Sequence, residues 1–439
     1  MATIIFATIG DPTGYKVVEY FIQNKKPVSS KVSYLALKEL LCQDTSQPQD
    51  IKTVAIIGIS TADSFKRIST TGNLGCNCDD YNSCSKCIID KAKEFDVRAD
   101  EFIVAPNMYK NFKSKPDYYF TYVYYSTLKI LENEENLTGV YLDITHGVNY
   151  MVDLAKEALL LATSAYASGK EKSVTFKVYN SDPLFRDETG QTSKGPYEIR
   201  EIEKRTINPL LGLKHVTTQI LSRISVDSNY FQNLRKDKVI NDITKITKST
   251  NALDNGLFVY FADKSSEIQK IMESLESKMD IDMEKCSDSQ KCDDEIRIEF
   301  KPGSYALLHS LLYIALRFKA KGNCLDINML KEFAEKYADK VTRTIIENEI
   351  DISIEKHKDK IGKEKKLLRE ITKGEKIERG SQRVGEKEGE GKSAEKRGFE
   401  KRILYAHGGL PEAGTYVYEQ DGKICVTYGD KIDEIENQL

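Results

Sequence analysis

Two residues near the carboxyl end of the chain, Arg402 and His407, are of types that can cleave RNA without a metal ion. A histidine can exchange a proton with a ribose 2′-hydroxyl or the leaving oxygen, and an arginine can stabilise the negative charge that grows on phosphorus. Positions five apart on one regular helix point about 140° away from each other. The pair would therefore converge only if the helix ended near the two following glycines, or if a dimer brought two copies together. On spacing alone, a chance pair is the simpler interpretation.

A second polar cluster is Asp143-Ile-Thr-His-Gly-Val-Asn149, which directly follows an apolar run. Thr145, His146 and Asn149 supply hydrogen-bond donors and acceptors, while Gly147 lets a ligand approach the backbone closely. If a helix begins after this cluster, its free N–H groups favour an anion. The alternative is a strand-to-helix turn with a polar cap.

Two other apolar runs end in small polar residues, at Gly10-Asp11 and Ser60-Thr61. In a parallel sheet the carboxyl ends of the strands share one edge, where ligands bind. The three polar strand ends together favour a phosphate-bearing ligand. The glycine spacing of a dinucleotide-binding fingerprint is missing after the first run, which argues against an NAD enzyme.

Four cysteines fall within twelve residues, namely Cys76, Cys78, Cys84 and Cys87. They could hold a structural zinc ion or form two disulfides, and in either case they would act as a staple on a loop. A second pair, Cys286 and Cys292, could form a local disulfide or remain free thiols.

The elements that must position these residues alternate over the first 180 residues. Apolar, β-branched runs predict buried strands at 3–9, 53–59, 101–105, 139–144 and 173–179. Helices are expected at 31–41, 118–131 and 152–167. This alternation predicts a parallel, doubly wound α/β sheet of Rossmann-like type.

Beyond about residue 200, helical patterns dominate. The clearest are an apolar helix at 304–317 and a charged, amphipathic one at 329–354, while 373–401 is rich in Gly, Glu and Lys and predicts a mobile loop. We expect an amino-terminal α/β domain followed by one or two helical domains, which agrees with a prior of about three domains for 439 residues.

The composition excludes several classes of protein. With 40% hydrophobic residues, 30% charged residues and a net charge of -3, the chain is neither a membrane protein nor a strongly cationic nucleic-acid binder. No run approaches the roughly 18 apolar residues that a membrane span needs. The first ten residues predict a strand and not a signal peptide, so we expect a cytoplasmic protein with no membrane partner.

The combined motifs resemble the CRISPR-associated CARF–HEPN ribonucleases of type III systems. The resemblance is carried by Asp-x-Thr-His-Gly-x-Asn at 143–149, the Gly10-Asp11-Pro12 loop, and Arg402-x-x-x-x-His407. It implies a Rossmann-like CARF domain with a parallel sheet at 1–200, a helical linker domain at 201–260 and an all-α HEPN ribonuclease domain at 261–439.

The resemblance also implies a mechanism. Members form homodimers or larger oligomers, and paired CARF domains bind a cyclic oligoadenylate, most often cyclic tetra-adenylate, as an allosteric activator. The HEPN domains then cut single-stranded RNA with no cofactor, leaving a 2′,3′-cyclic phosphate and a 5′-hydroxyl. By motif, Arg402 and His407 would be catalytic. The activator site would consist of Gly10, Asp11, Ser60, Thr61, Thr145, His146, Gly147 and Asn149.

One residue departs from the family pattern, since Ile403 stands where a polar residue often follows the motif arginine. Two rival interpretations stay open. The protein could be a non-enzymatic CARF-type sensor or transcription regulator that binds a cyclic oligonucleotide and nucleic acid. The CARF domain could also degrade its own activator, with Thr145 or His146 taking part.

Overall fold

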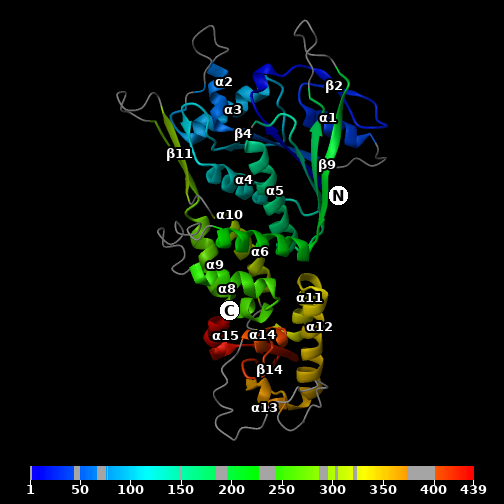
Figure 1. The fold of residues 1–439 in the computed structure, drawn as a ribbon, viewed down its shortest axis with the longest axis vertical. Coiled ribbons are helices and arrows are strands. Elements are labelled where there is room, and N and C mark those ends of the chain that lie inside the picture. The colour runs from blue at the N-terminus through cyan, green and yellow to red at the C-terminus, as the bar shows by residue number, and fades with distance from the viewer. Residues whose placement is uncertain are drawn as a thin grey trace.

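The amino-terminal part of the molecule is built on an eight-stranded sheet (Figure 1). The structure, a computed structural model, describes residues 2–43, 50–66, 76, 78–148, 150–183, 195–226, 243–285, 295–301, 305–319, 324–372 and 401–439. The strand order is β3-β2-β9-β8-β7-β1-β4-β5. These strands are β1 (Ala2–Ile9), β2 (Val18–Phe21), β3 (Val28–Ser30), β4 (Asp50–Gly58), β5 (Glu101–Ala105), β7 (Leu137–Asp143), β8 (Val174–Ser181) and β9 (Tyr197–Ile207).

The five strands β5-β4-β1-β7-β8 pair in parallel, as the alternation predicts. The sheet is then extended by β9, which runs antiparallel to β8 and continues to Ile207. Further out, β2 pairs with β9 in parallel and β3 pairs with β2 antiparallel. The outcome is a mostly parallel sheet of eight strands in the predicted amino-terminal α/β domain.

Helices cover both faces of the central part of this sheet, which explains why β1 and β4 are apolar at consecutive positions. Ile4 and Phe6 of β1 pack with α4 (Pro116–Glu132) and α5 (Tyr150–Gly169). The residues between and after them, Ile5 and Ala7, pack with α1 (Ser33–Cys42) and α3 (Tyr81–Glu94) on the other face. All four side chains are at most 1% exposed, so the strand is buried on both faces.

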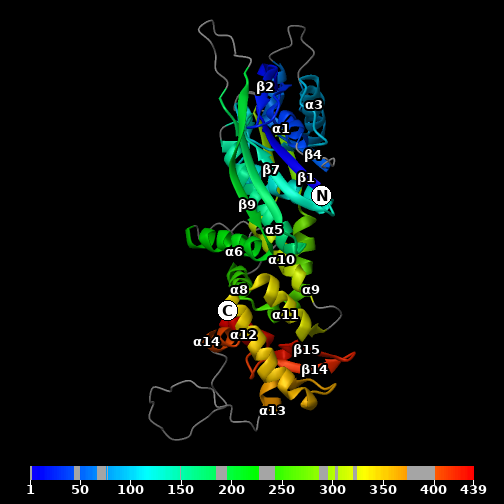
Figure 2. The ribbon, with the colours of Figure 1, turned by 90° about the vertical axis from the view of Figure 1, so that its right-hand side faces the viewer.

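Helices dominate the rest of the chain, and most of them lie beyond one end of the sheet (Figures 1 and 2). They are α6 (Pro209–Val226), α8 (Ile243–Asp254), α9 (Phe258–Glu276), α10 (Ala306–Ala315), α11 (Ile327–Tyr337), α12 (Lys340–Glu349), α13 (Leu368–Thr372), α14 (Lys401–Ala406) and α15 (Ile432–Gln438). Short helical turns include η1 (Pro12–Gly14), η2 (Ile59–Thr61) with α2 (Ala62–Lys66) directly after it, η3 (Leu316–Phe318), η4 (Ile350–Ile354), η5 (Glu355–Lys360) and η6 (Gly429–Lys431). In the part of the chain that the structure describes, no helix is both long and apolar enough to span a bilayer.

Short strands in this half were not expected from the sequence. A hairpin of β10 (Asp280–Lys285) and β11 (Ile296–Lys301) pairs with β6 (Phe112–Lys113). A second sheet has the order β12-β15-β14-β13, formed by β12 (Leu325–Asp326), β13 (Lys366–Leu367), β14 (Tyr416–Gln420) and β15 (Lys423–Thr427). The strands of two residues are too short to show a periodic pattern, whereas the β11 sequence Ile-Arg-Ile-Glu-Phe-Lys alternates apolar and charged residues and carried a strand signal that was missed.

The long amphipathic helix predicted at 329–354 is divided into two helices. Ala338 is extended, and the Asp339 carboxylate accepts hydrogen bonds at 2.9 Å from the backbone N–H groups of Val341 and Thr342. An aspartate that caps a helix start competes with helix continuation, which explains the break. The predicted loop at 373–401 lies almost entirely outside the described residues.

The four clustered cysteines form two disulfides, which is one of the two alternatives that the sequence left open. The bonds join Cys76 to Cys87 and Cys78 to Cys84. Over the described ranges, no group of three or more His, Cys, Asp or Glu side chains is arranged to hold a metal ion. Cys286 and Cys292 lie outside those ranges. A third disulfide, which the sequence did not suggest, joins Cys324 to Cys425.

The Cys324–Cys425 disulfide closes a loop with a sequence separation of 101 residues, whereas Cys78–Cys84 closes one of 6. Chain-entropy estimates give a stabilisation of about 4–5 kcal/mol for the long loop and about 2 kcal/mol for the short one. We therefore expect the double variant Cys324→Ser/Cys425→Ser to unfold at a clearly lower urea concentration than Cys78→Ser/Cys84→Ser under non-reducing conditions. Equal midpoints for the two variants would contradict this.

Candidate functional site

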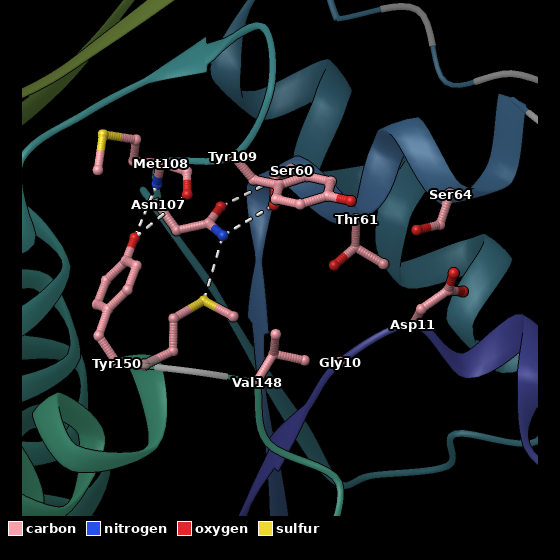
Figure 3. Close-up of a pocket in the computed structure, with 11 residues that line it drawn as sticks. Gly10, Asp11, Ser60, Thr61, Ser64, Asn107, Met108, Tyr109, Val148 and Tyr150 are labelled. Atoms are coloured by element: carbon pink, nitrogen blue, oxygen red, sulfur yellow. Dashed lines mark hydrogen bonds between the residues drawn. The ribbon is translucent and has the colours of Figure 1, made fainter.

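A cavity of about 150 Å³ lies at the carboxyl ends of β1, β4 and β5 (Figure 3). Its walls combine hydroxyl, amide and carboxyl groups with two tyrosines and two methionines. The lining residues are Gly10, Asp11, Ser60, Thr61, Ser64, Asn107, Met108, Tyr109, Val148, Tyr150 and Met151. The position is the one expected for a ligand site in a parallel α/β sheet.

The Asn107 side chain connects several of the segments that line this cavity (Figure 3). The side chain is 2% exposed and makes two hydrogen bonds to Ser60. The carboxamide oxygen accepts from the Ser60 backbone N–H at 2.9 Å, and the amide nitrogen donates to the Ser60 hydroxyl at 2.8 Å. The same nitrogen lies 3.2 Å from the sulfur of Met151 at the start of α5. Asn107 thus links the ends of β4 and β5 to the first turn of α5.

Gly10 brings the end of β1 against the loop that follows β7. Its N–H donates to the His146 carbonyl at 2.8 Å. A Cβ at this position would lie 2.4 Å from a Val148 methyl and 3.0 Å from the His146 carbonyl oxygen. Only glycine permits this approach, so the polar strand ends at Gly10 and at 143–149 lie at one place in the fold.

The side chains of Asp143 and Thr145 form an internal clamp outside the cavity wall. Asp143 is 1% exposed and accepts hydrogen bonds from the Thr145 backbone N–H at 2.9 Å and from its hydroxyl at 2.6 Å. It also accepts from the Ser33 hydroxyl at the start of α1. The Thr145 hydroxyl in turn accepts from the Ser181 backbone N–H at 3.0 Å. This network ties β7 to α1 and β8.

The His146 imidazole belongs to the same clamp. Its Nε2 accepts from the Ser33 backbone N–H at 3.2 Å, and its ring lies 4.3 Å from the Tyr15 ring, measured between centroids. Burial lowers the pKa of His146, although the Asp143 carboxylate acts in the opposite direction. A neutral imidazole agrees with its role as an acceptor at Nε2.

The predicted ligand residues therefore divide into two groups. Gly10, Asp11, Ser60 and Thr61 line the cavity. Thr145, His146 and Gly147 lie beside it without lining it, and Asn149 falls outside the described residues. Gly147 is required by packing, because a Cβ there would lie 2.1 Å from a Val152 methyl and 2.4 Å from the Thr8 hydroxyl.

Sequence reasoning missed Asn107, Tyr109 and Tyr150 among the lining residues. A signal for Asn107 existed, because it follows the predicted strand 101–105 as Ser60 follows 53–59. The tyrosines gave no such signal, since their approach to the cavity depends on how a loop and a helix start are folded.

The second candidate site is a tight turn at the end of α14. The helix stops at Ala406, and Gly408 and Gly409 adopt positive φ angles of 54° and 79°. The Gly409 N–H reaches back to the Leu404 carbonyl at 2.9 Å, a bond pattern typical of helix ends with glycine. A Cβ on Gly408 would lie 2.6 Å from Ile346 of α12. The helix therefore ends at the glycines, and the turn rests on α12.

His407 and Arg402 differ in how far their side chains are exposed to solvent. The Arg402 side chain is exposed, while the His407 side chain is 20% exposed, with its Nδ1 2.9 Å from an oxygen of Glu349 on α12. Within the described residues, no hydrogen bond or ion pair joins Arg402 to His407. Glu349 was not anticipated, because 58 residues separate it from His407 and it stands in a highly charged helix.

Comparisons with protein families place both sites inside recognised domains. Residues 4–183 match the family model for the CARF domain of the CRISPR system endoribonuclease Csx1, and residues 339–431 match the model for the HEPN domain of the same endoribonuclease. No curated protein matches the chain. The cavity residues fall in the first match, Glu349, Arg402 and His407 fall in the second, and together the matches cover more than half of the chain. The chain belongs to the CARF–HEPN family of CRISPR endoribonucleases.

Proposed function

We propose that the protein cuts single-stranded RNA without a metal ion and that cyclic oligoadenylate, as cyclic tetra-adenylate, activates it in type III CRISPR defence. The family domains support the broader statement, a CRISPR-associated ribonuclease that senses a cyclic oligonucleotide. The observation that carries the finer statement is the His407 turn. Nδ1 of His407 is held by Glu349, and no described residue hydrogen-bonds its Nε2, which is then available for proton transfer.

The proposed cleavage step uses one nucleophile that the RNA itself supplies. His407 Nε2 takes the proton of a ribose 2′-hydroxyl as that oxygen bonds to phosphorus. The bond from phosphorus to the 5′-oxygen breaks, that oxygen takes up a proton from water, and the His407 imidazolium returns its proton to the solvent. The products are a 2′,3′-cyclic phosphate and a 5′-hydroxyl. Arg402 would stabilise the extra negative charge on the phosphoryl oxygens. Because Arg402 and His407 do not meet within one chain, we propose that a homodimer completes the site.

The proposed activator site is the cavity in the CARF domain. Hydroxyl groups of Ser60 and Thr61 can hydrogen-bond phosphate or ribose oxygens, and the Asp11 carboxylate can accept from a ribose hydroxyl or an adenine amine. The rings of Tyr109 and Tyr150 offer surfaces for base stacking. The clamp of Asp143, Thr145 and His146 would fix the cavity walls.

Helix α5 offers a physical connection between the two proposed sites (Figures 1 and 2). Tyr150 and Met151 of its first turn line the cavity. Its 20 residues span about 30 Å at 1.5 Å per residue. At its far end, the Ser168 carbonyl accepts a hydrogen bond from the hydroxyl of Tyr337, the last residue of α11. We propose that ligand binding is transmitted along this helix.

The first prediction from this proposed function concerns the activator cavity. Replacing Thr61, which is 7% exposed, by glutamate puts a negative charge into the cavity wall beside Asp11. We expect the affinity for cyclic tetra-adenylate, measured by calorimetry, to fall about 10- to 100-fold by charge repulsion. Thr61→Ser keeps the hydroxyl and should bind like wild type. Unchanged affinity in Thr61→Glu would place the ligand elsewhere.

The second prediction concerns the catalytic pair. Arg402→Ala and His407→Ala should each lower cleavage of a fluorescent single-stranded RNA by at least about 100-fold in EDTA, because each removes a group that acts on the reacting phosphate. Binding of cyclic tetra-adenylate should stay unchanged. Retained cleavage in both variants would overturn the assignment. If no cyclic oligoadenylate elicits cleavage in wild type, and duplex DNA binds instead, the non-enzymatic regulator is favoured.

The third prediction concerns coupling. Tyr337→Phe removes only the hydroxyl that bonds to the end of α5. We expect activator affinity and unstimulated cleavage to stay close to wild type, while the activation factor falls about 2- to 30-fold, as for a change of 0.5–2 kcal/mol in coupling energy. Tyr313→Phe is a matched control, since its hydroxyl bonds to Glu132 and not to α5. A full activation factor in Tyr337→Phe would show that this bond does not carry the signal.

A further inference from the structure

Hydrogen bonds hold both carboxylate oxygens of Glu349, and one of these bonds is to His407. Glu349 is the last residue of α12, and the side chain is 13% exposed. One carboxylate oxygen lies 2.9 Å from His407 Nδ1, and the other accepts from the Ser353 hydroxyl at 3.1 Å. Both oxygens are therefore held, one by the imidazole and one by the turn η4 that follows α12.

The chemistry of this contact selects one form of the imidazole. An ionised carboxylate can only accept hydrogen bonds, so Nδ1 must carry the proton. The neutral ring then has its lone pair on Nε2, the nitrogen that no described residue bonds. When Nε2 accepts a proton, the adjacent negative charge stabilises the imidazolium that forms. A carboxylate that orients a histidine acts in this way in the serine protease triad.

Two glutamates near the end of α12 have different partners, and Glu349 is the one that contacts His407. On the same helix, Glu347 pairs with Arg343 at 2.8 Å, and on α14 the Arg402 side chain is exposed. Helix α12 also supplies Ile346, the residue against which Gly408 packs. One helix thus sets both the place of the turn and the orientation of its imidazole.

We infer that Glu349 is a positioning residue for RNA cleavage, which holds His407 in the tautomer with the proton on Nδ1 and leaves Nε2 as the proton acceptor. The inference rests on the proposed function, because it requires His407 to be catalytic. It assigns to α12 a direct role in the active site. It also gives α5 a short route to that site, since Tyr337 and Asp339 lie at the junction of α11 and α12.

The test measures cleavage by the full chain, with saturating cyclic tetra-adenylate, in EDTA. We expect Glu349→Gln to lower kcat about 100-fold with KM within about two-fold, because the amide can donate to Nδ1 and favour the wrong tautomer. Glu349→Asp keeps the carboxylate and should recover part of the loss. Glu347→Gln is the matched control from the same helix and should cleave like wild type.

A spectroscopic measurement separates positioning from a merely structural role. The chain has five histidines, so ¹⁵N-histidine labelling gives few signals, and His407→Ala identifies the one from His407. Wild type should show the proton on Nδ1, and Glu349→Gln should show a mixture of tautomers or a proton on Nε2. If Glu349→Gln proves poorly folded, Ser353→Ala frees one carboxylate oxygen of Glu349 and should lower kcat a few-fold while the proton stays on Nδ1; an unchanged kcat would then overturn the positioning role.

The outcomes distinguish this inference from the proposed function. If His407→Ala is inactive while Glu349→Gln cleaves within about two-fold of wild type, Glu349 has no positioning role and the proposed function stands. The same conclusion follows if the tautomer is unchanged in Glu349→Gln. If His407→Ala still cleaves, the proposed function fails, and this inference fails with it.

Discussion

The arrangement of both sites depends on how the carboxyl end of α5 is held. Just after the helix, the Glu171 carboxylate pairs with Arg317 at 2.6 Å and with Lys336 at 2.7 Å. Burial alone would raise the pKa of Glu171, but these two cations outweigh it and lower the pKa. Gly169 completes the junction, because a Cβ there would lie 2.3 Å from the Tyr313 ring. Charge and close packing thus fix α5 against α10, η3 and α11, which join the CARF sheet to the HEPN region.

The sequence predicted the CARF core well because its information there is local. The strands β1 and β4 are buried on both faces along most of their length, so an apolar, β-branched run is sufficient to locate them, and the similar run at 101–105 is β5 to the residue. The polar residues that follow such runs then fall on one sheet edge by topology alone. Gly10, Ser60 and Thr61 were found in this way, and Asn107 obeys the same rule.

The remaining parts depend on contacts between distant residues, which a single sequence does not reveal. Thr145 and His146 have the chemistry of ligand residues, but Ser33 and Ser181 engage them from elsewhere in the chain. The carboxylate of Glu349 is one among many in a charged helix, and only the fold places it 2.9 Å from His407. The disulfide partner of Cys324 likewise could not be inferred from the sequence, because 101 residues separate it from Cys425. The second sheet was missed because two of its strands have only two residues, and because the pairing of all four strands depends on contacts between distant parts of the chain.

The proposed activator can switch cleavage only if it binds one arrangement of the molecule more tightly than another. The contacts between the cavity and His407 run along α5, α11 and α12, and a hydrogen bond lies at each junction. Tyr337 meets α5, Asp339 caps α12, and Glu349 holds the imidazole. A small shift of α12 would alter the 2.9 Å contact at His407 and the packing under Gly408 together. Because a hydrogen bond weakens steeply with misalignment, such a shift is sufficient to change how the imidazole is held.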